Sequence, residues 1–336
     1  MRVSIFPLRK KTFTAGISCR VVRELLYLNR ADVERLLDVD AMLEAIAGAL
    51  VLFSSGVTSA PPRTAAIAAK GLMGLMAGYV PGVALEAKLV SVFPGNHAHG
   101  VPSHQALIAL FDEKDGTPLA LMDGTYITAI RTGGAAAVAA RALSRQGSSV
   151  LAILGAGVQG GSHLDTFTHV RDFKEIRVAS RDDAKAAALA ARHPLARVAA
   201  SFEDAVRGAD VVACCTDARE PVIRREWLGR GTHVSSVGGT FGPELDPATM
   251  AAGRVFVEWR GAATNAPPAG AHELQGLDPG VITEVGEVLA GTKPGRVSDS
   301  DITIYKSTGH AVEDAATASL VYARALAEGA GVKLPL

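Results

Sequence analysis

The stretch Val150-Leu151-Ala152-Ile153-Leu154-Gly155-Ala156-Gly157-Val158-Gln159-Gly160 decides the fold that the sequence predicts. Its first five residues are apolar, which is typical of a strand buried on both faces of a parallel sheet. Three glycines follow: Gly155 permits a tight turn, Gly157 lets the backbone approach a pyrophosphate, and Gly160 lets a helix pack closely. A helix-prone segment over 162–170 then offers N–H groups to the phosphate. The stretch predicts a dinucleotide-binding turn.

From Val150 onward the chain alternates between strand-like and helix-like segments, which is typical of a doubly wound parallel sheet, the Rossmann arrangement. Six strands are expected there, at 150–154, 175–180, 197–200, 210–215, 232–237 and 254–258. The earlier part has short apolar runs between Pro-Gly and Asp-Gly turns, which predict a mostly antiparallel sheet. Those runs cover 64–69, 72–79, 84–93, 105–112 and 118–123.

Helical patterns link these two parts. One begins at Asn29, a good N-cap, and continues to Gly56. A second, Ala-rich pattern over 126–144 marks the junction. After a further strand at 301–306, a last helix over 310–329 carries an apolar stripe that would return the chain end to the first part.

The predicted fold class is therefore α/β, with a Rossmann domain inserted into a second α+β domain. We expect the Rossmann domain at 131–304, and the second domain at 24–130 plus 305–330. Residues 1–23 contain six basic and no acidic residues, and we expect a disordered basic extension there.

The composition excludes several classes of protein. Lys plus Arg and Asp plus Glu number 34 each, so the bulk charge does not favour a nucleic-acid partner, and no apolar run is long enough for a membrane span. Cys19, Cys214 and Cys215 form no CxxC pair, which indicates reduced cysteines and a cytoplasmic location. The nine histidines lack zinc spacing, so we expect no metal.

The end of the second Rossmann strand bears on the choice of cofactor. An acid at this place favours NAD, because it binds the ribose hydroxyls. Here the strand ends in Ser180-Arg181-Asp182. Ser180 and Arg181 can accept a 2′-phosphate, which favours NADPH, whereas Asp182 keeps NADH possible and is equally well explained as a helix N-cap.

Four polar residues outside the glycine turn are candidates for chemistry. Lys88 lies in an otherwise apolar strand, as an edge gatekeeper or as a buried functional ammonium. Arg63 follows two prolines, and Arg131 lies among small residues that would allow a ligand to approach. His104 is a proton donor or a hydrogen-bonded turn residue.

Several motifs together resemble the ornithine cyclodeaminase/mu-crystallin family, and the stretch over 102–162 is more similar to its mu-crystallin (ketimine reductase) branch. The similarity covers about residues 25 to 330, nearly the whole chain. The motifs are Pro61-Pro62-Arg63, the Lys88 strand, Pro102-Ser103-His104-Gln105-Ala106, Asp123-Gly124, Thr128-Ala129-Ile130-Arg131-Thr132, the glycine turn, Lys306-Ser307-Thr308-Gly309 and Val312-Glu313-Asp314.

The resemblance implies that the second domain binds substrate and forms a homodimer. It implies that Arg63 and Lys88 hold a substrate carboxylate and that Arg131 lies between substrate and cofactor phosphates. The substrate-side residues are then Arg63, Lys88, Arg131, Thr240 and Thr308. The cofactor-side residues are Arg131, Thr132, Val158, Gln159, Thr216 and Ser307, besides the three glycines and residues 180–182.

One departure from the family pattern bears on the reaction. Cyclodeaminases carry an aspartate in a Gly-Gly-Asp run, and this chain has Thr240 at that place. Threonine cannot act as a general base at neutral pH, so cyclisation of a diamino acid would lose its proton acceptor. Hydride delivery to a preformed C=N bond does not need that carboxylate, which favours a reductase.

The leading hypothesis is an NAD(P)H-dependent reductase of small cyclic ketimine carboxylates of the Δ1-pyrroline- or Δ1-piperideine-2-carboxylate type. Lys88 or His104 would keep the imine protonated. Three alternatives stay open: an ornithine cyclodeaminase that uses Glu244 or water as its base, an alanine-dehydrogenase-like enzyme, and a nucleotide-dependent protein that binds a small ligand without turnover.

Overall fold

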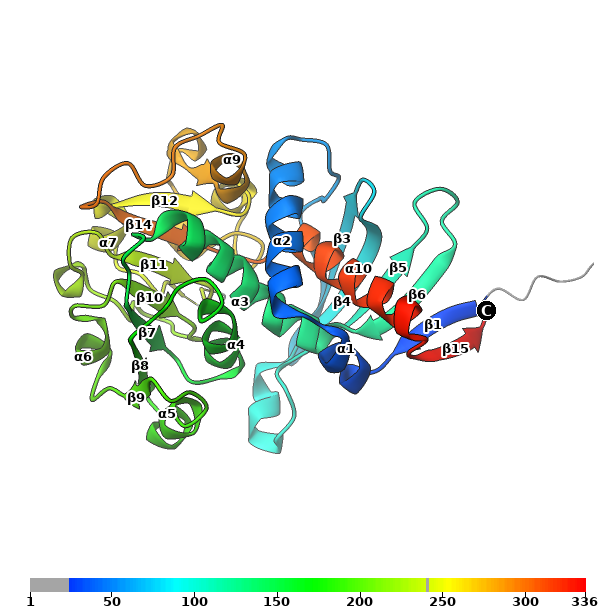
Figure 1. Cartoon of the computed structure of the whole chain (residues 1–336), viewed down its shortest axis with the longest axis horizontal. Helices are drawn as coiled ribbons and strands as arrows, with labels where there is room; N and C mark the ends of the chain where they lie inside the picture. The colour runs from blue at the N-terminus through cyan, green and yellow to red at the C-terminus, as the bar shows by residue number, and fades with distance from the viewer. Residues whose placement is uncertain (1–23, 240–241) are drawn as a thin grey trace, which may run out of the picture.

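The computed structural model describes residues 24–239 and 242–336, and their strands form two sheets. The predicted basic extension over 1–23 and Thr240 lie outside the described residues. Figure 1 shows the two sheets side by side, with helices α2, α3 and α10 between and over them. This arrangement confirms the α/β fold class with a Rossmann sheet.

The first sheet has seven strands in the order β15-β1-β6-β5-β4-β3-β2. Strands β2 to β6 pair antiparallel to one another, as the turn pattern predicts, while β1 runs parallel to β6. The strands are β1 (Glu24–Leu28), β2 (Thr64–Ala68), β3 (Gly71–Val80), β4 (Ala84–Val92), β5 (His104–Phe111), β6 (Pro118–Asp123) and β15 (Val332–Pro335).

The sequence patterns missed two of these strands. β1 and β15 pair with each other at one edge, so the two ends of the described chain lie together (Figure 1). Each is at most five residues long, and β15 is exposed along its whole length. An exposed strand such as β15 has no buried face and hence no apolar alternation, and its existence depends on the partner strand.

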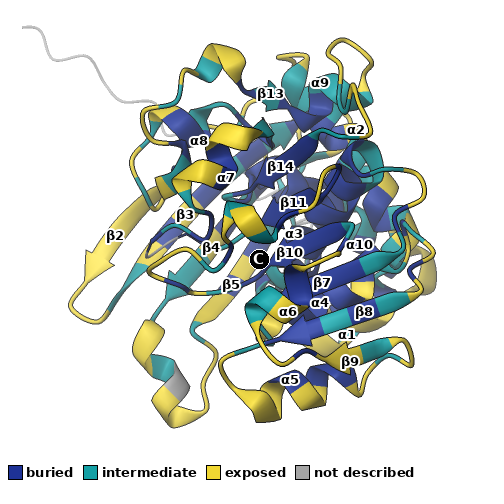
Figure 2. Cartoon of the chain, turned by 90° about the vertical axis from the view of Figure 1, so that its left-hand side faces the viewer, coloured by how far each residue is buried: buried dark blue, intermediate teal, exposed yellow. Residues whose placement is uncertain are grey.

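The second sheet has eight strands, all parallel, in the order β13-β12-β14-β11-β10-β7-β8-β9. They are β7 (Val150–Leu154), β8 (Glu175–Ala179), β9 (Ala196–Val198), β10 (Val211–Cys214), β11 (His233–Ser236), β12 (Gly253–Val257), β13 (Thr283–Glu284) and β14 (Ile302–Lys306). β14 is the further strand predicted at 301–306, whose place in a sheet the sequence did not indicate; it lies between β12 and β11. Figure 2 shows that the central strands are buried.

Helices α2, α3 and α10 join the two sheets through one apolar core. Met42 and Ile46 of α2, Ala136 of α3, Ile153 of β7 and Val312 of α10 belong to the same buried cluster. The helices are α1 (Arg30–Leu36), α2 (Val39–Ser54), α3 (Gly124–Leu143), α4 (Val158–Phe167), α5 (Asp183–Ala190), α6 (Phe202–Val206), α7 (Pro247–Ala252), α8 (Gly261–Thr264), α9 (Val285–Leu289) and α10 (Ala311–Glu328), with short 3-10 turns η1 (Pro94–His99), η2 (Arg225–Trp227), η3 (His272–Leu274) and η4 (Pro279–Val281).

Asn29 caps α1 as predicted, through a bond from the Asp32 amide. The single helix expected from there to Gly56 is wrong, because α1 ends at Leu36 and Asp38 caps a second helix, α2. An Asp side chain that accepts a bond from a nearby amide competes with helix continuation, so it starts a new helix here.

The packing of α3 against α4 leads to a stability prediction. A Cβ at Gly133 of α3 would lie 2.7 Å from the Ser162 carbonyl oxygen, whereas a Cβ at Gly48 of α2 meets nothing within 4 Å. We expect Gly133→Ala to lower the free energy of unfolding by about 1–3 kcal/mol through overpacking. The control Gly48→Ala should raise it by about 0.5–1 kcal/mol, because alanine favours the helix. Thermal unfolding followed by circular dichroism measures both, and equal shifts would contradict the close approach.

Candidate functional site

The glycine turn has the geometry that a dinucleotide requires. Gly155 has φ +104°, and a Cβ there would lie 2.5 Å from the Cys215 carbonyl oxygen. A Cβ at Gly160 would lie 2.1 Å from the Gly155 carbonyl oxygen, so helix and turn are in direct contact. At Gly157, in contrast, nothing lies within 4 Å, and no side chain caps the start of α4 there. An uncapped helix N-terminus with open space beside it fits a pyrophosphate.

The residues after β8 lie next to this turn along the sheet, because β8 pairs with β7. Arg181 is exposed, and its guanidinium lies 3.1 Å from an Asp217 carboxylate oxygen. Asp182 caps α5 by accepting a bond from the Lys185 amide, and the Ser180 hydroxyl accepts from the Asp182 amide. Asp182 therefore has a structural role that does not depend on a cofactor.

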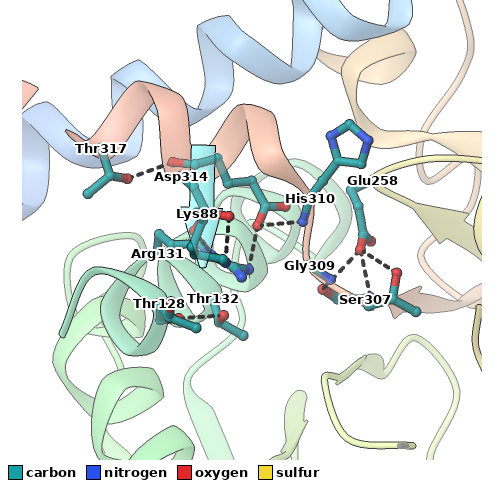
Figure 3. A network of polar contacts seen from close by, with 12 residues as sticks. Lys88, Thr128, Arg131, Thr132, Glu258, Ser307, Gly309, His310, Asp314 and Thr317 are labelled. Carbon is teal, nitrogen blue, oxygen red and sulfur yellow. Dashed lines mark hydrogen bonds and ion pairs between the residues drawn. The ribbon is translucent and has the colours of Figure 1, made fainter. Parts of the chain in front are cut away.

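Lys88 is a buried ammonium. It lies on β4 with 1% of its surface exposed, and its Nζ donates to Asp314 Oδ2 of α10 at 2.6 Å. The other Asp314 oxygen accepts from Arg131 Nε of α3 at 2.9 Å, and Arg131 Nη1 donates to Glu313 at 2.7 Å. Figure 3 shows Asp314 between the two cations. Three elements that are far apart in the sequence thus meet at one carboxylate.

These buried charges shift one another's titration. Burial lowers the pKa of Lys88 to about 8, although Asp314 opposes the shift. Burial raises the pKa of Glu313 to about 8, against the pull of Arg131. Burial also tends to raise the pKa of Asp314, but Arg131 and Lys88 outweigh it, so that pKa is lowered and Asp314 stays ionised. The site therefore holds two cations, Lys88 and Arg131, beside the ionised carboxylate of Asp314.

Arg63 reaches the same region from the start of β2. Its Nη2 donates to the carbonyl oxygens of Thr308 and Gly309, both at 2.5 Å. Gly309 has φ +74°, and a Cβ there would lie 2.5 Å from Arg131 Nη1, so only glycine lets the loop lie against Arg131. A small pocket opens beside Arg63, lined also by Met76, Trp259 and Ala311.

Glu258 follows β12, and its place in the sequence suggests a helix-start or surface carboxylate, but the structure buries it. It is fully buried, and one oxygen accepts from the Thr308 amide at 2.6 Å and from the Ser307 and Thr308 hydroxyls at 3.3 Å (Figure 3). The Thr308 hydroxyl also accepts from the Trp259 indole. Glu258 therefore shapes the loop that carries Ser307, at the carboxyl end of β14.

His104 lies away from this cluster. It pairs with Val92, whereas Lys88 pairs with Ile108, so four residues of β4 separate the two, roughly 13 Å along a strand. The imidazole is exposed and lies 3.1 Å from the Ser103 hydroxyl. Five of the predicted residues thus lie in one region: Arg63, Lys88, Arg131, Ser307 and Thr308. His104 lies outside this region, at the start of β5.

Two further predicted cofactor residues have partners within the protein. The Thr132 hydroxyl bonds to the Thr128 carbonyl of its own helix. The Thr216 amide and hydroxyl both donate to Glu244, whose other oxygen accepts from the Ser236 hydroxyl and the Gly238 amide. Glu244 thereby fixes the loops that follow β10 and β11. Both loops lie at the carboxyl end of the sheet, where ligands bind in this fold.

Four acids of this region received no functional role from the sequence: Glu86, Glu258, Glu313 and Asp314, although Glu313 and Asp314 belong to one of the family motifs. The signal available for them was an acid inside an apolar strand or at the start of an Ala-rich helix. Within residues 24–239 and 242–336, no cluster of three or more His, Cys, Asp or Glu could hold a metal ion. In the same residues, no helix has the length and apolar character needed to cross a membrane.

The site and the fold together define a class of protein: a Rossmann dinucleotide-binding protein with a buried cluster of charged side chains where β4, α3 and α10 meet. Residues 23–329 match the model of the ornithine cyclodeaminase/mu-crystallin family, and the chain belongs to that family. This confirms the resemblance drawn from the sequence motifs.

Three relatives illustrate the similarity. The chain is 40% identical to ketimine reductase mu-crystallin of Mus musculus, over 84% of this chain and 91% of that protein. Δ1-pyrroline-2-carboxylate reductase of Thermococcus litoralis, solved with NADH and L-proline, superposes with a TM-score of 0.86 at 34% identity, covering 92% of this chain and all of the other. An archaeal alanine dehydrogenase dimer with bound NAD gives 0.85 at 33% identity, covering 94% and 100%.

Proposed function

We propose that this protein is an NAD(P)H-dependent reductase of small cyclic ketimine carboxylates, of the Δ1-pyrroline- or Δ1-piperideine-2-carboxylate type. The observation that carries the proposal is the convergence of Arg63, Lys88 and Arg131 beside the loop of Ser307 and Thr308. Arg63 lines a small pocket, and Lys88 and Arg131 are buried behind residues that line it: Met76 pairs with Lys88, and Gly309 lies against Arg131. Cations suit a compact anion, and guanidinium groups suit a carboxylate in particular. The reductases of this family described above are named for substrates of this kind.

In this proposal each residue has a defined role. Arg63 and Lys88 hold the substrate carboxylate, and Asp314 keeps Lys88 and Arg131 in place. The three glycines of the turn, with Val158 and Gln159, bind the pyrophosphate, while Thr132, Thr216 and Ser307 lie toward the nicotinamide side. The reduced nicotinamide, when bound, supplies hydride to the imine carbon. Positioning both reactants in a buried site that excludes water provides much of the acceleration.

The structure weakens the cyclodeaminase alternative. That reaction needs a base in place of the missing aspartate, and Glu244 was the candidate. Glu244 is fully buried, and its two oxygens already accept four bonds from Thr216, Ser236 and Gly238. A carboxylate held in this way is a support for two loops and not a free base. The alanine dehydrogenase alternative keeps the support of the archaeal relative, and the assay below separates it.

The test is oxidation of NADPH and NADH by the purified protein, followed by absorbance, with each cyclic imine. Pyruvate plus ammonia and L-ornithine plus NAD run in parallel. We expect turnover with a cyclic imine and none with ornithine.

We also expect the KM for the cyclic imine to rise as the pH passes about 8, because Lys88 then loses its charge. Arg63→Lys should raise KM about tenfold or more, because it removes the planar fork that matches a carboxylate. Formation of proline and ammonia from ornithine would contradict the proposal. Turnover with pyruvate plus ammonia, and with neither cyclic imine, would favour the alanine dehydrogenase alternative.

We propose NADPH as the preferred cofactor, on the basis of Ser180 and Arg181 at the end of β8. Arg181 is exposed beside the glycine turn and can turn from Asp217 to a 2′-phosphate. Asp182 is already occupied as the cap of α5. Arg181→Ala should weaken NADPH binding about tenfold and leave NADH binding unchanged, because one charge-assisted pair is lost. Isothermal titration with each nucleotide measures this, and equal losses for both would contradict the preference.

We propose a homodimer that forms through the outer face of the first sheet. Leu75, Leu89 and Leu107 pair across β3, β4 and β5, and each is more than 40% exposed. An exposed apolar row of this kind marks a protein interface. Leu89→Glu should convert a dimer into a monomer in light scattering after gel filtration, whereas Val281→Glu, an equally apolar exposed site elsewhere, should not. A dimer that persists in Leu89→Glu would exclude this face.

A further inference from the structure

Glu86 is a buried carboxyl group for which the proposed function has no role. It lies on β4 two residues before Lys88, so both side chains point to the same face of the sheet. Only 2% of its surface is exposed, and neither carboxyl oxygen has a hydrogen-bond partner among the described residues. A buried polar group without a partner in a folded protein calls for a ligand, a water or a catalytic role.

Glu86 lies next to residues that line the Arg63 pocket. Gly78 lies opposite on β3, and a Cβ there would be 3.1 Å from Glu86 Oε1 and 3.1 Å from the Ala311 Cβ. Ala311 and Met76 line the pocket together with Arg63, and Met76 is paired with Lys88. The absence of a side chain at Gly78 thus makes the space in which the carboxyl group lies.

Glu86 differs from the acids of α10 in its partners. Asp314 has two cationic partners and Glu313 has one, whereas Glu86 has none among the described residues. The charged groups that act on it are Asp314 of α10, Lys88 of its own strand and Arg131 of α3; its strand neighbours Gly78 and Leu110 do not titrate. Burial raises the pKa of Glu86 well above its ordinary value, and the two cations only partly oppose this.

The two donors considered from the sequence are less well placed. The Lys88 ammonium is engaged with Asp314 at 2.6 Å in a buried ion pair. His104 lies at the exposed end of β5, four residues from the partner of Lys88. Glu86 has no hydrogen-bond partner among the described residues, and it lies on the same face as Lys88, which is proposed to hold the substrate carboxylate. It is therefore better placed than Lys88 or His104 to donate a proton to the imine nitrogen.

We propose that Glu86 is the proton donor to the imine nitrogen, an inference that rests on the proposed reductase function. In this step the O–H bond of Glu86 breaks, and the lone pair of the imine nitrogen forms the N–H bond of an iminium. Glu86 is left as a carboxylate near the Lys88 ammonium, which stabilises it, and it regains a proton from water after the product leaves. The step is an acid–base exchange and needs no oxidant or reductant.

The test compares two substrates at an alkaline pH at which the free imine is neutral. One is Δ1-pyrroline-2-carboxylate, and the other is its N-methyl iminium form, whose permanent charge makes a proton donor unnecessary. We expect Glu86→Gln to lower kcat on the neutral imine about 100-fold, the usual scale of general acid catalysis, and to leave the N-methyl substrate nearly unchanged. Glu44→Gln, the same change at an exposed surface carboxylate, should affect neither.

The other outcomes overturn the inference in distinguishable ways. Equal losses on both substrates would show that Glu86 only supports the fold, and no loss on either would show that another group donates the proton. If the variant does not fold, the wild type provides the test: its kcat on the neutral imine should fall with rising pH, while its kcat on the N-methyl substrate should not. A wild type that is silent with both substrates removes the reductase function and the inference with it.

Discussion

The site depends on one buried carboxylate, Asp314, that forms ion pairs with two cations. Lys88 comes from a strand of the first sheet and Arg131 from the helix that joins the two sheets, and both donate to it. Removing one member of such a buried set costs about 3–5 kcal/mol, because it leaves a charge without compensation. Asp314 therefore sets the relative positions of β4, α3 and α10, and with them the place where a substrate anion would bind.

The same region is built around residues without side chains. Gly309 lets the loop after β14 lie against Arg131, Gly133 lets α3 lie against α4, and Gly78 makes room for Glu86. Charged groups can be brought together inside a protein only if their own chains approach closely and water is excluded. The glycines allow this approach, and the apolar core shared by α2, α3 and α10 provides the exclusion. The buried site and the packing of the two sheets are thus one structural feature.

Sequence patterns predicted the parts of the fold whose signal is local. The apolar run before Gly155 and the spacing of the three glycines predicted β7 and a helix after it, because turn, strand and helix there depend on neighbouring residues. The predicted start at residue 162 is wrong, since α4 begins at Val158. The antiparallel strands β2 to β6 followed from their turns. The position of β14 within the second sheet could not be predicted in this way, since the order of parallel strands depends on crossovers between distant segments. β15 was missed because it is exposed along its whole length and forms by pairing with β1, at the other end of the described chain.

The sequence by itself determined the family, the dinucleotide turn and the identity of three cations, Arg63, Lys88 and Arg131. These are matters of residue type and spacing, which the chain carries locally. Only the tertiary structure decided what those cations contact and that Glu258 is buried. It also decided that both Glu244 oxygens accept hydrogen bonds from Thr216 and Ser236. The physical reason is that the state of a charged group depends on its burial and its partners, and both come from segments that meet only when the chain has folded.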